Sequence, residues 1–198
     1  MTEPPAIGVP TVRDTPPGIR EWVCFPGAWA LVGFGITCLV VGSSRVMAVG
    51  GYCAQGGPYE VAVACPTGST GPVFAALPAV ALAVLVGIFG ARGFGVPVHG
   101  YFWSALFGAQ GIAFFVAAAA HAGPTTGWII CGVVFVLVAL LPAPLLAIGW
   151  PRAFFGRRRL DGRAVDHYGL PLPDAVVIGS AWAVSTAAGA TLALWWIG

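Results

Sequence analysis

The sequence predicts an all-α integral membrane protein in which five transmembrane helices form a bundle. Three observations support this fold class: the composition, five long uncharged runs, and the distribution of arginine along the chain. Hydrophobic residues make up 58% of the 198 residues and charged residues only 8%, whereas roughly a quarter of a soluble domain is charged. A soluble core of this size would leave much apolar surface in water, so the composition favours a lipid environment.

The charged residues also exclude several classes of function. All nine basic residues are arginine, and without lysine the chain can form neither a P-loop nor a lysine Schiff base. The net charge of +2 is small and scattered, which argues against a nucleic-acid partner.

Five uncharged runs are long enough to cross a bilayer, whose hydrocarbon core of ~30 Å needs about 20 apolar residues in a helix. Each is apolar on all sides, unlike a surface helix of a soluble protein. The predicted spans are 26–48, which continues past the end of its uncharged run at Ser44 through Arg45, and 73–91, 101–120, 127–148 and 175–197. They form a single transmembrane domain over 22–198, preceded by a proline-rich tail, 1–21, that we expect to be disordered.

Arginines fall in alternate connections, which predicts the orientation. Arg13 and Arg20 precede the first span, Arg92 separates the second from the third, and all but one of the others lie between the fourth and fifth. By the positive-inside rule, the N-terminus is cytoplasmic, the C-terminus is outside, and the protein is a multi-pass protein of the bacterial plasma membrane. The alternative, a signal peptide, is disfavoured because residues 1–20 contain five prolines and two acids and no clear cleavage site follows.

The polar segment 50–72 between the first two spans contains Cys53 and Cys65. On the outer side of the membrane thiols oxidise, so we expect these two cysteines to form a disulfide that closes the loop. The entropy model gives such a loop a stabilisation of roughly 3 kcal/mol. The alternative is a redox-active pair, but catalytic dithiols usually have Cys-x-x-Cys spacing.

Small residues recur at four-residue spacing on two spans. Because helices in lipid associate through close backbone approach, we expect both stripes to face other helices of the same chain. The alternative is that one stripe forms a subunit interface. The stripes are Ala79, Ala83, Gly87 and Ala91 on the second span, and Ala181, Ser185, Gly189 and Ala193 on the fifth.

Gln110 is the only strongly polar side chain near the centre of a predicted span. We expect it to form an interhelical hydrogen bond rather than to bind a ligand. No acidic residue or lysine lies deep in any predicted span, which argues against a proton-coupled carrier or an ion pump.

The segment 150–174 combines aromatic residues with a cluster of arginines. Such a segment suits the membrane interface, where arginines contact anionic headgroups; the alternative is a docking surface for a partner protein. The residues expected to contact lipid headgroups or a partner are Arg152, Arg157, Arg158, Arg159 and Arg163.

No constellation of residues indicates an enzyme or a cofactor site. The three histidines, His99, His121 and His167, are expected at different depths and so cannot pair as axial haem ligands. A metal site from Asp161, Asp166 and His167, with His99, matches no ligand template. Nucleophile motifs are also absent, so we expect no cofactor, metal or catalytic residue.

The elements "GGYC" and "GGPYEVAVACP" between two alanine- and glycine-rich spans resemble loops of small polytopic membrane proteins of actinobacteria. The resemblance covers about the first half of the chain and implies no activity and no functional residue. The arginine-only, alanine-rich composition is similar to that of high-GC bacteria.

The leading hypothesis is a non-catalytic membrane subunit or interaction protein that associates with itself or with another membrane protein. Five helices leave more perimeter than they bury against each other, and segment 50–72 would serve as a recognition surface. Two alternatives stay open: an oligomeric channel or transporter for a small solute, and a membrane enzyme that acts on lipid through the 161–167 region.

Overall fold

The computed structural model describes residues 18–51, 53, 63–91, 94–96, 98–120, 125–142, 157–160, 163–166 and 172–198. Within these ranges the secondary structure is helical apart from one short ribbon, as expected for the predicted class, and turns join the elements. The helices are α1 (Ile19–Met47), α2 (Thr70–Leu85), the π-helical turn η1 (Val86–Gly90), α3 (Val98–Ala120), α4 (Thr126–Leu140) and α7 (Leu172–Ile197). The strands are β1 (Arg157–Leu160) and β2 (Arg163–Asp166).

Four helices of the described chain are long and apolar enough to cross a membrane, which indicates a multi-pass membrane protein. They cover Ile19–Met47, Thr70–Gly90, Gly100–Ala120 and Val176–Ile197. The predicted fourth span, 127–148, is represented by the 15 residues of α4. At 1.5 Å per residue, α4 is shorter than the ~30 Å hydrocarbon core. Residues 143–150 lie outside the described ranges, so this fourth span, and with it the count of five, stays a prediction.

Several helix ends differ from the predicted bounds. Helix α1 begins at Ile19, inside the predicted tail 1–21, whose residues 1–17 lie outside the described part. The backbone N–H of Gly18 donates to Glu21 Oε2 at 3.0 Å, which satisfies one donor at the start of the helix. Helix α2 begins at Thr70 rather than at Val73. Both helices therefore begin in residues that precede the apolar runs.

The strands β1 and β2 form an antiparallel pair within the predicted segment 150–174. The register places Arg157 opposite Asp166 and Leu160 opposite Arg163. The sequence between the strands is Asp161-Gly162, a dipeptide strongly favoured in two-residue hairpins. The sequence therefore contains a local signal for this pair of strands.

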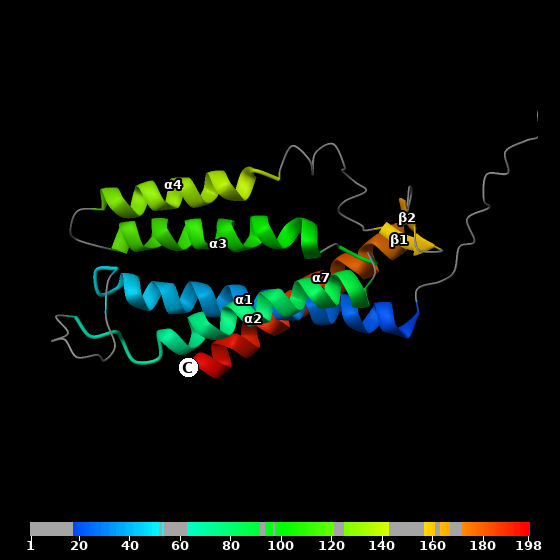
Figure 1. The fold of residues 1–198 in the computed structure, drawn as a ribbon, viewed down its shortest axis with the longest axis horizontal. Coiled ribbons are helices and arrows are strands. Elements are labelled where there is room, and N and C mark those ends of the chain that lie inside the picture. Colours follow the sequence, from blue (N-terminus) through cyan, green and yellow to red (C-terminus); the bar gives the residue numbers. More distant parts are fainter. Residues whose placement is uncertain are drawn as a thin grey trace, which may run out of the picture.

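Helix α1 is the centre of the bundle. It packs against α2, α7 and α3, whereas α4 packs chiefly against α3. Two pairs of contacts show that α1 and α3 run in the same direction: Trp29 to Val96 near their starts, and Ser43 to Gln110 farther along. In Figure 1, α4, α3 and α1 lie one below another, and α2 and α7 run obliquely across α1.

The helix ends gather at two ends of the bundle (Figure 1). One end contains the end of α1, the start of α2, the end of α3, the start of α4 and the end of α7. The other end contains the start of α1, the β1–β2 ribbon and the start of α7. The described connections thus alternate between two ends, as a chain that repeatedly crosses a bilayer requires.

Glycines let α1 approach two neighbours at once. A methyl group added at Gly33 would collide with the backbone carbonyl of Thr186 in α7. On the side facing α2, a methyl group at Gly35 would lie 3.1 Å from the Ala76 carbonyl oxygen. Close backbone approach of this kind is the main source of helix association in lipid, so α1 is built to contact two helices.

Candidate functional site at the disulfide end

At the end of the bundle that contains Cys53 and Cys65, a disulfide and several side-chain hydrogen bonds join polar segments of the described chain. We call this end of the bundle the disulfide end and define it by Arg45, the disulfide, the Pro66–Ser69 turn and Ile197. Its parts come from the end of α1, the start of α2 and the end of α7, and side-chain bonds tie these elements together.

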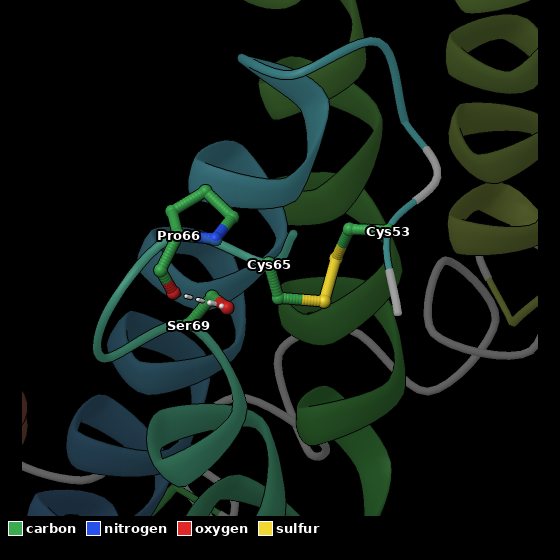
Figure 2. Close-up of a disulfide and its surroundings, with 4 residues drawn as sticks. All are labelled: Cys53, Cys65, Pro66 and Ser69. Carbon is green, nitrogen blue, oxygen red and sulfur yellow. Dashed lines mark hydrogen bonds between the residues drawn. A yellow bond between two sulfur atoms is a disulfide. The ribbon is translucent and has the colours of Figure 1, made fainter. Parts of the chain in front are cut away.

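Cys53 and Cys65 form a disulfide with a Cα–Cα distance of 4.8 Å, which confirms the predicted pair (Figure 2). The two cysteines are 12 residues apart. The bond joins the segment that follows α1 to the segment that precedes α2, so it closes the connection between these two helices at its base.

A tight turn follows Cys65 and starts α2. The Ser69 hydroxyl donates to the Pro66 carbonyl at 2.8 Å, and the Ser69 backbone N–H lies 3.1 Å from the same oxygen (Figure 2). Ser69 is fully buried, and Gly68 has a φ of +77°, a conformation that L side chains rarely adopt. Proline, glycine and serine are thus placed as the turn requires.

Arg45 connects three elements of this end. Its guanidinium donates to the carbonyl of Gly68 at 2.9 Å and to the carbonyl of Ile197, in the last turn of α7, at 3.4 Å. The last carbonyls of a helix lack intrahelical partners and attract cations, so arginine suits this place. A methyl group at Gly68 would lie 2.7 Å from Arg45 Nη1, which is a second reason for glycine there.

Arg45 is the one arginine that lies outside the three arginine-containing segments of the sequence, and the sequence does not indicate its partners. Its contacts depend on α7, which lies 152 residues farther along the chain, and no local pattern reveals such a partner. Gly51, with a φ of +85°, lies against the ring of Trp128 near the start of α4. The disulfide end therefore also reaches the α3–α4 hairpin.

The predicted small-residue stripe of α7 lies against α1. A methyl group at Gly189 would collide with the carbonyl of Ala30, Ser185 and Ala193 are buried, and Ala181 packs on the main core cluster. The stripe therefore serves contacts within the chain.

The α2 stripe is divided between two neighbours. Ala83 is fully buried in the core cluster, while Ala79 is half-buried. A methyl group at Gly87 would lie 3.1 Å from the Cβ of Val98, so this part of η1 packs against the start of α3.

Gln110 is buried at 6% exposure and bonds across helices. Its Nε2 donates to the Ser43 hydroxyl at 2.9 Å, and that hydroxyl donates to the Val40 carbonyl at 3.1 Å. The geometry agrees with the expected interhelical hydrogen bond between α3 and α1.

The predicted arginine cluster lies away from the disulfide end. Arg157, Arg158 and Arg159 are in β1 and Arg163 is in β2, and Figure 1 places this ribbon near the start of α7. Arg152 lies outside the described residues. Lipid-headgroup or partner contacts of these arginines stay a prediction.

The histidine and aspartate cluster cannot be assembled from the described residues. Asp161, His121 and His167 lie outside the described ranges, whereas Asp166 is in β2 and His99 is in α3. Among the described residues, no group of three His, Cys, Asp or Glu side chains lies together.

An aromatic corner at the opposite end was not foreseen. Trp29 Nε1 donates to the Val96 carbonyl at 2.8 Å in a buried bond, and Phe25 and Trp22 make edge contacts with Phe94. The three α1 aromatics are spaced i, i+3 and i+7, the pattern of one helix face, so the signal was present in the sequence.

The disulfide end offers backbone groups and small side chains on a braced surface. Ala64, Thr67 and Gly68 are exposed, whereas the groups that hold the turn are buried or bonded. No protein-family model, curated protein or solved structure matches this chain.

Proposed function

We propose that this protein is a non-catalytic membrane protein that binds another membrane protein, or a second copy of itself, with the disulfide end as its recognition surface. The observation that carries the proposal is the bracing of residues 63–70. The disulfide, the Arg45 bonds and the Pro66–Ser69 turn attach this segment to α1 and α7, while Thr67 and its neighbours stay exposed.

Bracing of this kind favours binding because a preordered segment loses little conformational entropy when it contacts a partner. A connection whose only task was to join α1 to α2 would need no disulfide and no arginine link to a third helix. The exposed groups are small, so a partner can approach the backbone closely.

The proposal includes an orientation and a location. We propose five spans, with the N-terminus and the β1–β2 ribbon in the cytoplasm and the disulfide end outside a bacterial plasma membrane. Arginine-rich connections on one side and a disulfide on the other, where the compartment is oxidising, support this arrangement. Membrane-impermeant thiol labelling of intact cells tests it: in a variant without free cysteines, a cysteine at Thr67 should be labelled and one at Gly162 should not.

Site-specific photo-crosslinking in native membranes tests recognition. A photoreactive residue at Thr67 should give one adduct of discrete mass. The same residue at Ala183, an exposed position on α7, is the control and should give lipid adducts only. Removing the disulfide by Cys53→Ser with Cys65→Ser should weaken the Thr67 adduct several-fold in protein that is still folded.

The mass of the adduct identifies the partner class: twice the chain mass means self-association, and any other discrete mass means a different protein. If Thr67 gives only the lipid adducts seen at Ala183, or if its protein adduct is unchanged without the disulfide, the disulfide end is not the recognition surface.

A further inference from the structure

An apolar groove of about 460 Å³ runs between α2 and α3, with α1 as its floor. Leu39 of α1 lies at its base, Leu77, Ala81 and Leu85 line the α2 side, and Phe102 and Leu106 line the α3 side. Its volume is within the usual range of small-molecule sites, about 300–1,000 Å³.

The groove exists because α2 and α3 are close together at one end and diverge toward the other. Gly87 holds α2 close to Val98 at the start of α3, and the two helices separate from there toward the disulfide end (Figure 1). Ala81 is too small to fill the widening space. In a membrane this space is open to lipid chains, because Leu77 and Leu85 are both largely exposed.

A cation lies just beyond the groove. Arg20 is exposed, and its Nη2 donates to the carbonyl of Phe89 at 3.0 Å. Phe89 lies in the π-helical turn η1, which continues α2 directly after Leu85. The neighbouring carboxylate of Glu21 accepts from the Gly18 N–H. The guanidinium has five N–H donors, so donors besides the one bonded to Phe89 are available to an anion.

We propose that the groove binds one acyl chain of an anionic glycerophospholipid from the surrounding bilayer, with the lipid phosphate at Arg20. The length fits: from Leu77 to Leu85 helix α2 rises about 12 Å, within the half-thickness of the ~30 Å hydrocarbon core that one acyl chain spans. The guanidinium fork matches phosphate geometry. The groove offers no polar group that a peptide backbone would need, so a lipid is the occupant that its lining favours.

This site is separate from the disulfide end and does not rest on the proposed recognition function. Arg20 lies near the start of α1, whereas Arg45 lies near its end. The two proposals can therefore fail independently.

Native mass spectrometry of the full chain tests the inference. Protein released from bilayers of phosphatidylcholine and phosphatidylglycerol, mixed 3:1, should retain one phosphatidylglycerol. Arg20→Gln should lower the preference for phosphatidylglycerol over phosphatidylcholine about tenfold, since it removes a charge-assisted contact. Arg13→Gln removes the same charge from the N-terminal segment and should leave the preference unchanged.

Ala81→Phe fills the groove and should reduce retention of both lipids several-fold. Ala183→Phe adds the same group to an exposed position on α7 and should leave retention unchanged. Leu77→Trp, also at an exposed position, should reduce retention of both lipids as Ala81→Phe does. Agreement of the two variants shows that the loss does not come from a folding defect of one of them. Formation of the Cys53–Cys65 disulfide reports folding in each case.

The inference is wrong if folded Arg20→Gln protein keeps the wild-type lipid preference, or if both groove-filling variants retain lipid as the wild type does. It is also wrong if the two controls lose lipid to the same extent, because the loss would then reflect general lipid contact.

Discussion

The unit of α1, α2 and α7 and the hairpin of α3 and α4 are held together in different ways. In the first unit, glycines meet backbone atoms of the facing helix: Gly33 faces Thr186, and Gly189 faces Ala30. In the hairpin the backbones approach less closely. An added methyl group at Gly111 would lie 3.1 Å from the Gly132 carbonyl oxygen, one at Gly132 would meet the ring of Phe115 at 2.8 Å, and side-chain hydrogen bonds add to the contact.

The difference shows which part of the bundle can adjust. A side chain can rotate away from a new atom, whereas two helix backbones can only separate. Lipid tails are as apolar as the side chains, so separation is not opposed by a hydrophobic effect. We expect the first unit to tolerate little change and the hairpin to tolerate more, with Ser43 and Gln110 linking the two.

Gly189→Ala should have the largest effect, because its methyl group collides with the Ala30 carbonyl. We expect a loss of about 3 kcal/mol in the free energy of unfolding, at the upper end of overpacking costs, measured by denaturation in mixed micelles. Gly179→Ala on the same helix, where an added methyl group meets nothing within 4 Å, is the matched control. Equal stability of the two variants would contradict the backbone contact.

Cys53→Ser combined with Cys65→Ser tests the staple between α1 and α2 in the first unit. The entropy model for a loop with this separation of 12 residues gives an expected loss of about 2–3 kcal/mol. Cys131→Ser, which changes a free and exposed cysteine, should leave stability unchanged. Comparison of the three proteins without reductant measures the effect; a fully stable double variant would show that the staple is dispensable.

Ser43→Ala and Gln110→Leu test the link between the two units. A double-mutant cycle should give a coupling energy of about 0.6–1.7 kcal/mol, the range measured for interhelical hydrogen bonds in membranes. Ser44→Ala paired with Gln110→Leu is the control, because the Ser44 hydroxyl bonds to Val40 within its own helix. Additive effects of the Ser43 and Gln110 changes would rule out the link.

Ser104→Ala should have the smallest effect, because the Ser104 hydroxyl donates at 2.8 Å to the Ala139 carbonyl in the hairpin, which can adjust. We expect a loss of about 0.5–1 kcal/mol in the same denaturation measurement. Thr191→Ala is the comparison, since its hydroxyl bonds only to the Ala187 carbonyl of its own helix. A loss above that of Gly189→Ala would reverse the proposed order of the two units.

The helical class, the multi-pass character and the disulfide could be predicted from the sequence. Apolar runs of bilayer length permit few structures other than helices, because backbone groups in lipid must bond within their own segment. Cys53 and Cys65 lie close along the chain in one polar segment, so their pairing needed no knowledge of distant contacts. The small-residue stripe of α7 was also readable, although its partner was not.

Only the tertiary structure decided which helices meet and what the ends of the bundle contain. Arg45 reaches Ile197, Trp29 reaches Val96, and Arg20 reaches Phe89, and each pair is separated by at least 67 residues. The groove between α2 and α3 likewise depends on how two helices diverge. In lipid every apolar helix face is acceptable to its surroundings, so hydrophobicity by itself does not select partners; close backbone approach and a few polar bonds do.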